Sequence, residues 1–253
     1  MKFYIIVFFF ITSAFIVEMS AQDTPETFKR DGKYGLINSS FNIVAEPIFE
    51  EIEDFSGDYA RVKLDGQWTY VDKTGKLLID PMFDEVEDFS DDMARVKFDY
   101  KWTFINTNGK FIIDPIFQEA EDFSNGYARV MINYRWTFID KNAKFIIEPK
   151  YESLDAVSTS APIRYKLNGK WGYMDSSGKI LIDPIFEEAN TFSDDLARVK
   201  IKGSWGYINK SFKFVLAPVY DAAADFSNGL ASVTYKGREV YIDTKGNVFQ
   251  KIE

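Results

Sequence analysis

The chain of 253 residues contains no cysteine and no histidine. These absences exclude a cysteine or histidine nucleophile, a histidine general base, a disulfide bond, and a zinc site with thiolate or imidazole ligands. Any chemistry would have to use carboxylates, lysine, tyrosine or hydroxyl groups, or Ca²⁺ or Mg²⁺ held by oxygen ligands.

Basic residues are fewer than acidic residues. The chain has 30 Lys and Arg residues and 39 Asp and Glu residues, which gives a net charge of −9. Binding to phosphate groups depends on clusters of Lys and Arg. We therefore expect no nucleic-acid partner and no docking on an anionic lipid surface. The apolar fraction of 46% is ample for a folded core.

The N-terminal segment has the pattern of a secretory signal. Lys2 precedes an apolar run over residues 3–17, and small and polar residues follow up to Ala21. Such a run suits the core of a signal peptide, about 7–15 residues, better than a membrane span of about 20. We predict a cleaved signal peptide at residues 1–21 and export to the periplasm, the cell surface or the medium. The alternative is an uncleaved N-terminal anchor, which would be the only membrane contact.

The rest of the chain is a repeat with a period of 34 residues, interrupted by one step of 35. Four columns keep this spacing: proline, an aromatic residue that is usually Trp, Arg, and a Phe-Ser pair. The prolines are Pro47, Pro81, Pro115, Pro149, Pro184 and Pro218, and the aromatic residues are Tyr34, Trp68, Trp102, Trp136, Trp171 and Trp205. The columns predict about seven repeats in one domain, residues 26–253.

Some helical repeat proteins also have a period of 34 residues. Each repeat of this chain, however, has the composition of short β-strands. Residues 60–64 alternate apolar and charged, and Asp65-Gly66 suits a two-residue turn in which both residues have positive φ. Residues 68–71 are all aromatic or β-branched, residues 76–80 are mainly apolar, and a second turn separates the two segments. We therefore predict an all-β fold of three-stranded antiparallel meanders.

Such a sheet cannot bury both of its faces alone, so successive repeats must stack. We expect an open, solenoid-like superhelix. The alternative is a closed, propeller-like ring, in which residues 26–40 would contact residues 230–250.

One element of the repeat resembles a known family. Lys170-Trp171-Gly172-Tyr173, the following Ser177-Gly178-Lys179 and Asp183-Pro184 resemble the WG-repeat (KWG-type) family of bacterial proteins. In three repeats Thr replaces the Gly, which leaves the strand intact but removes any close backbone approach that Gly allows. The resemblance implies a repeat scaffold that binds protein or envelope ligands and carries no general catalytic motif.

Two sets of acidic pairs recur in the repeat. The first set includes Glu50-Glu51, Asp84-Glu85 and Glu187-Glu188, and the second includes Glu53-Asp54, Glu87-Asp88 and Glu121-Asp122. A calcium loop would alternate Asp, Asn and Gly, and a glycosidase needs one special pair in a cleft. We therefore expect the acids to pair with the arginine column, namely Arg61, Arg95, Arg129, Arg164 and Arg198. We predict no catalytic residue, no metal site and no cofactor.

The candidate contact residues are those that break the repeat. Tyr100 and Tyr134 stand at hairpin tips where other repeats have Gly, so we expect them to be exposed and to form a contact surface. Residues 153–164 lose the Asp-Phe-Ser motif and gain one residue, which indicates either a groove or neutral drift in a loop.

The sequence thus predicts an exported, non-enzymatic scaffold that binds a protein or glycan partner at the cell envelope. A carboxylate-based glycan hydrolase and a purely structural envelope spacer are the alternatives.

Overall fold

The computed structural model describes residues 24–158 and 161–249. These residues form β-strands and turns, without a helix, and build seven antiparallel sheets in tandem. The all-β fold with a repeat near 34 residues is confirmed. The predicted signal peptide, residues 1–21, lies outside the described residues.

Every sheet is built on one β-hairpin. The first hairpin strands are β1 (Glu26–Arg30), β5 (Tyr59–Leu64), β8 (Met93–Phe98), β11 (Tyr127–Ile132), β14 (Ile163–Leu167), β18 (Leu196–Ile201) and β22 (Leu230–Tyr235). The second hairpin strands are β2 (Lys33–Ile37), β6 (Gln67–Asp72), β9 (Lys101–Asn106), β12 (Arg135–Asp140), β15 (Lys170–Met174), β19 (Ser204–Asn209) and β23 (Arg238–Asp243).

Outer strands flank the hairpins. Before the hairpin, and paired with its first strand, lie β4 (Glu51–Ile52), β7 (Glu85–Ser90), β10 (Glu119–Ala120), β13 (Ser153–Leu154), β17 (Glu188–Ala189) and β21 (Ala222–Ala223). After the hairpin, and paired with its second strand, lie β3 (Ile43–Phe49), β16 (Ile180–Phe186), β20 (Phe214–Tyr220) and β24 (Val248–Phe249). In the last three sheets the predicted three-stranded meander is therefore extended by a leading strand of two residues. In the second to fourth sheets the leading strand joins the hairpin alone, and the third strand predicted at residues 76–80 is reduced to an isolated bridge.

The returning strand forms fully only where the aromatic residue is followed by Gly. In the repeats with Gly35, Gly172 and Gly206 it is a seven-residue strand, β3, β16 or β20. A Cβ at Gly172 would lie 2.7 Å from the carbonyl oxygen of Ile182 on β16, so only Gly lets this strand approach.

The repeats with Thr69, Thr103 and Thr137 keep only isolated bridges to the returning segment, such as Trp68 with Phe83. Their buried threonine hydroxyls donate to that segment, for example from Thr69 to the Ile79 carbonyl at 2.6 Å. The predicted loss of close approach in the Thr repeats is confirmed.

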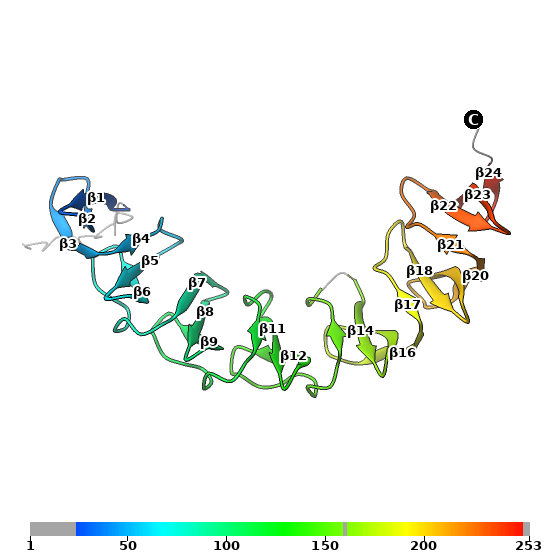
Figure 1. The fold of residues 1–253 in the computed structure, drawn as a ribbon, viewed down its shortest axis with the longest axis horizontal. Helices are drawn as coiled ribbons and strands as arrows, with labels where there is room; N and C mark the ends of the chain where they lie inside the picture. The colour runs from blue at the N-terminus through cyan, green and yellow to red at the C-terminus, as the bar shows by residue number, and fades with distance from the viewer. Residues whose placement is uncertain (1–23, 159–160, 250–253) are drawn as a thin grey trace, which may run out of the picture.

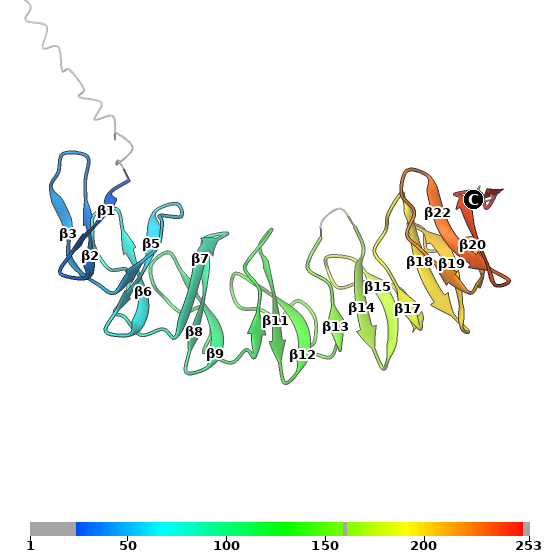
Figure 2. The same ribbon diagram turned by 45° about the horizontal axis from the view of Figure 1, so that its top comes forward.

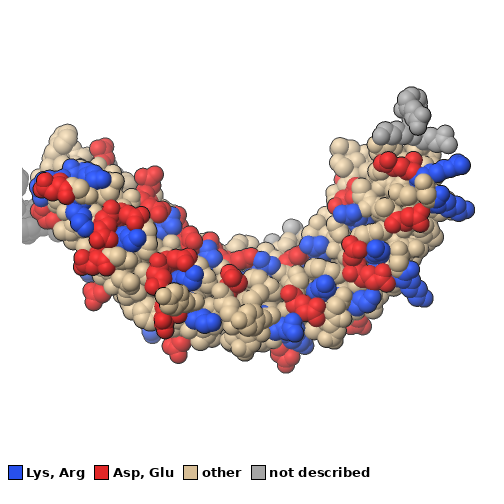
Figure 3. All heavy atoms as spheres, in the orientation of Figure 1, with Lys and Arg blue, Asp and Glu red and all other residues tan. Residues whose placement is uncertain are grey.

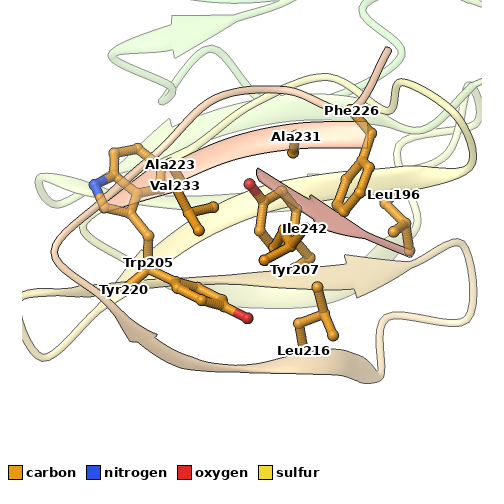
Figure 4. Packing of buried hydrophobic residues seen from close by; sticks show 10 residues of the cluster. All are labelled: Leu196, Trp205, Tyr207, Leu216, Tyr220, Ala223, Phe226, Ala231, Val233 and Ile242. Atoms are coloured by element: carbon orange, nitrogen blue, oxygen red, sulfur yellow. The ribbon is translucent and has the colours of Figure 1, made fainter. Parts of the chain in front are cut away.

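The core lies between the sheets rather than within them. Six clusters of buried side chains fill the six junctions, and each cluster joins two successive sheets. Figure 4 shows the junction of the last two sheets, where Tyr207 packs against Phe226 with their ring centroids 4.7 Å apart. Ala231 and Ile242 complete this junction from the last sheet. Stacking therefore buries the faces that one sheet cannot cover alone.

The stacked sheets form an open arc. Figures 1 and 2 place the first sheet, β1 to β3, and the last sheet, β21 to β24, at opposite ends of the arc. The solenoid-like array is confirmed, and the closed ring is wrong. In the second and third sheets, β4 and β7 lie toward the concave side, while β6 and β9 lie toward the convex side (Figure 1).

Candidate functional site

The hairpin turns form a rim along one side of the arc (Figure 2). Both residues of each turn have positive φ, for example 52° at Asp65 and 80° at Gly66, as the predicted two-residue turn requires. The first turn residue changes from acidic to basic along the chain: Asp31, Asp65, Asp99, Asn133, Asn168, Lys202 and Lys236. We call these seven turns the hairpin rim.

Tyr100 and Tyr134 occupy the second turn position in the third and fourth sheets. Their φ angles are 62° and 58°, so the turn keeps the shape that it has where Gly stands. Their side chains are 81% and 78% exposed, which confirms the predicted exposure. A left-handed conformation costs a residue with a Cβ about 1–2 kcal/mol relative to Gly. The fold itself therefore favours Gly at both positions.

Most turns of the hairpin rim are held by an acidic side chain that follows the proline of the preceding repeat. The Glu50 carboxylate accepts from the Gly66 amide at 3.0 Å, and Asp84 accepts from the Tyr100 amide at 3.1 Å. The amide hydrogen bond and the ammonium group of Lys33 hold the pKa of Glu50 below its ordinary value. Tyr134 differs, because Gln118 replaces the acid and its buried Oε1 has no hydrogen-bond partner in the described part of the chain.

From the second sheet to the sixth, the arginine column joins each sheet to the next. Arg164 Nη1 donates to the Ala189 carbonyl at 2.8 Å, and Arg198 Nε pairs with Asp225 at 2.8 Å. Arg198 also lies 5.2 Å from the ring centroid of Trp205, a cation–π distance. The aromatic and arginine columns thus stabilise the stack together.

The predicted pairing of acids with arginine is confirmed for the second acidic set and wrong for the first. In the second set, Asp88 and Asp122 pair with Arg61 and Arg95 at 3.0 and 3.1 Å. In the first set, one acid holds a turn amide, and the other pairs with the lysine opposite it on the hairpin. These lysine pairs are Glu51 with Lys63, Glu85 with Lys97 and Glu188 with Lys200.

The second turn of each repeat is closed by an Asp or Asn side chain. The Asp175 carboxylate accepts from the Ser177 hydroxyl at 2.6 Å and from the amides of Ser177 and Lys179 at 2.9 and 3.0 Å. These hydrogen bonds, led by that of the hydroxyl, hold the pKa of Asp175 below its ordinary value. The Asp175 carboxylate therefore stabilises the turn.

Buried tyrosines also have shifted pKa values. Burial raises the pKa of Tyr165 to about 12 and also raises that of Tyr173. The Tyr173 hydroxyl donates to the Asn190 carbonyl of the next sheet at 2.6 Å. These phenols remain neutral at physiological pH and serve the junctions.

The irregular repeat keeps its place in the stack. Its additional residue lies in the loop between β13 and β14, part of which is outside the described residues. Arg164 still reaches the next sheet, and its Nε pairs with Asp155 at 2.6 Å. Among the residues in the described ranges, no group of three or more acidic side chains is placed to hold a metal ion.

Sequence reasoning missed the acids that hold the hairpin rim. Their signal is a spacing of 16 or 17 residues between the acid and the second turn residue, as between Glu187 and Gly203 or between Glu152 and Gly169. It also missed Phe41, which is 85% exposed with a φ of 62° in the second turn of the first repeat, where four other repeats have Gly.

The fold defines the chain as an open stack of β-sheet repeats. The model of the WG containing repeat family matches residues 34–68, 68–102, 102–136, 136–171, 171–204 and 205–238. The chain belongs to this family, which confirms the resemblance seen in the sequence.

Three of the solved structures that match the chain show a distant likeness to it. Kluyveromyces lactis Hsv2p has a TM-score of 0.37 at 11% identity, over 88% of this chain and 90% of that chain. A eukaryotic initiation factor has a TM-score of 0.41 at 13% identity, over 90% and 73%. PorZ of Porphyromonas gingivalis, a surface component of the type-IX secretion system, has a TM-score of 0.34 at 10% identity, over 91% and 37%. At such TM-scores these likenesses say nothing about function. No curated protein matches the chain.

Proposed function

We propose that this chain is an exported, non-enzymatic scaffold that binds a protein or glycan partner at the cell envelope, with Tyr100 and Tyr134 of the hairpin rim as the contact residues. The observation that carries the proposal is that two exposed aromatic residues have a left-handed backbone conformation, which Gly would adopt at lower cost. Residues held in sparsely populated backbone regions concentrate at binding sites.

The surroundings of the two tyrosines suit a binding site. Exposed aromatic residues within a polar surface are typical centres of binding energy. Tyr100 and Tyr134 lie on successive sheets, and polar or charged residues occupy the first position of every turn in the rim. Acidic and basic side chains are interspersed over the face seen in Figure 3.

Export is proposed from the N-terminal sequence, with Lys2 and the apolar run at residues 3–17 as its support. Within residues 24–158 and 161–249 we find no helix that could cross a membrane. A non-enzymatic role is proposed because the recurring acids and tyrosines hold turns and junctions. No observation on the described residues favours the hydrolase alternative.

The test uses Tyr100→Gly, Tyr134→Gly and the double variant. The purified chain is incubated with envelope fractions of the producing organism, and the bound material is measured with and without prior protease or glycosidase treatment. We expect the double variant to lose at least about tenfold in binding. Protease sensitivity would identify a protein partner, and glycosidase sensitivity a glycan.

The same variants should be more stable than the wild type, by about 1 kcal/mol each, because Gly relieves the left-handed strain. Unfolding in urea measures this gain, so a loss of binding cannot be attributed to unfolding. Phe41→Gly is the matched control, since it removes an exposed aromatic at positive φ outside the hairpin rim. Equal binding by the wild type and the double variant would disprove the proposed contact surface.

A further inference from the structure

The first repeat has no arginine at the position that the arginine column occupies in the following repeats. Arg61 pairs across its hairpin with Tyr70, and the same place in the first sheet, opposite Leu36, is held by Thr27. The second to sixth sheets carry Arg61, Arg95, Arg129, Arg164 and Arg198. The first junction of the stack therefore lacks the guanidinium group that the next five positions supply.

The other junctions show what a guanidinium group binds at this place. Its Nη1 donates to a main-chain carbonyl of the next sheet, 25 residues further along the chain. These acceptors are Val86, Ala120, Leu154, Ala189 and Ala223. In three junctions its Nε also pairs with a carboxylate 27 residues further along, at 2.8 to 3.1 Å. These carboxylates belong to Asp88, Asp122 and Asp225. The repeat thus builds a guanidinium socket between two sheets.

By their spacing in the sequence, counterparts of these acceptors are present at the first junction. The same spacings from Thr27 lead to Ile52 on β4 and to Asp54. Among the described residues, Asp54 has no ion pair, whereas Asp88, Asp122 and Asp225 each pair with an arginine.

A cavity of about 520 Å³ lies at this junction. Its lining includes Thr27, Glu26, Glu53, Asp54 and Phe55. Glu53 is already paired with Arg61, so Glu26 and Asp54 contribute the negative charge that no cation among the described residues pairs with.

We infer that this cavity is a socket for an arginine side chain presented by a protein partner. The inference rests on the proposed binding function and names the partner as a protein. A planar guanidinium group can donate to a carbonyl and to carboxylates at the same time, which the ammonium group of lysine does less well. Phe55 offers an apolar wall for the aliphatic stem of the arginine side chain. A neutral glycan has no group of this charge.

The first experiment uses a capped peptide, acetyl-Gly-Gly-Arg-Gly-Gly-amide, titrated into the purified full chain and followed by NMR. We expect shifts of the backbone amides of Thr27 and Asp54. The citrulline peptide, which is neutral and of similar shape, should bind at least about tenfold more weakly, and the lysine peptide several-fold more weakly. Equal affinity for the arginine and lysine peptides would indicate diffuse attraction and overturn the inference.

The second experiment fills the socket from within the chain. Thr27→Arg places the chain's own guanidinium group at the first junction, so it should reduce the affinity for the arginine peptide at least tenfold while the chain stays folded. Asp54→Asn removes one charged acceptor and should weaken binding about tenfold. Ser232→Arg is the matched control, because it adds the same charge in the last described sheet, which no further sheet among the described residues follows. Undiminished peptide binding by folded Thr27→Arg would overturn the inference.

The failure of this inference is distinguishable from that of the proposed function. If the tyrosine variants lose an identified partner while Thr27→Arg and Asp54→Asn bind it like the wild type, the socket is wrong and the hairpin rim stands. If the arginine peptide occupies the socket while the tyrosine variants keep full partner binding, the socket stands and the hairpin rim is wrong.

Discussion

At the scale of the residue, the polar side chains that recur in the repeat have structural partners. Arg198 joins two sheets, Glu50 holds a turn amide, and Asp175 closes the second turn of its own repeat. In the last sheet the Arg and Trp of the columns are replaced by Ser232 and Glu239, which hydrogen-bond to each other at 2.9 Å. This polar pair suits a sheet face that no further sheet among the described residues covers.

The turn aspartates predict an acid-sensitive stability. The pKa of Asp175 is lower in the folded chain than its value of about 4 in the unfolded chain, so its contribution is full above pH 4 and is lost as the pH falls through the folded pKa. Asp175→Asn should accept the same amides without titrating, as Asn106 and Asn209 do in their repeats. We expect the variant to lose less stability than the wild type between pH 5 and pH 2, measured as the thermal midpoint.

Asp183→Asn is the control for that experiment, because Asp183 is an exposed aspartate on the neighbouring strand β16. An identical pH dependence of the wild type and Asp175→Asn would contradict the assigned role of the carboxylate.

At the scale of the element, the residue after the aromatic column decides whether the sheet has a full returning strand. Gly172 admits β16, and the ring of Tyr165, its partner across the hairpin, covers the glycine. The Tyr165 hydroxyl donates to the Ile182 carbonyl at 3.2 Å. The Thr repeats have a valine in place of this tyrosine, for example Val62 opposite Thr69. The two positions across the hairpin are therefore matched in size in these repeats, but not in the sixth sheet, where a valine also stands opposite the glycine.

This matching predicts a coupling between the two residues. Gly172→Thr alone should cost about 1–3 kcal/mol, because the new side chain overlaps the Tyr165 ring and the Ile182 carbonyl. Adding Tyr165→Val should recover part of that loss, with a coupling of at least about 0.5 kcal/mol. Urea unfolding of the two single variants and the double variant measures the coupling, and strictly additive effects would contradict the matching.

At the scale of the whole molecule, the chain is a stack in which each sheet contacts its sequence neighbours. The six buried clusters each join two successive sheets, and the arc places the first and last sheets apart. Such a stack leaves a long continuous rim accessible to a partner. In a closed ring of the same sheets this rim would be circular.

The open arc predicts the size of the molecule in solution. A compact domain of this length would have a radius of gyration of roughly 18 Å. Small-angle scattering of the purified chain should give a clearly larger value. The control is a compact globular protein of equal length measured under the same conditions. A value near that of the compact control would contradict the open arc.

The sequence by itself determined what is local and repeated. Alternation in residues 60–64, the Asp65-Gly66 turn and the proline columns specify strands and turns over a few residues, and the period requires stacking because one sheet cannot cover its own faces. The exposure of Tyr100 and Tyr134 followed from the same register. The substitution of Thr for Gly also predicted the loss of close backbone approach in three repeats.

Only the tertiary structure decided what depends on distances between repeats. Whether the stack closes depends on the small rotation from each sheet to the next, summed over six junctions, and no local pattern encodes that sum. The partner of each acid is likewise decided by the space between hairpins, so Glu50 holds Gly66 while Asp88 meets Arg61. The socket beside Thr27 emerges for the same reason, since a missing arginine becomes a cavity only when the next sheet supplies the remaining walls.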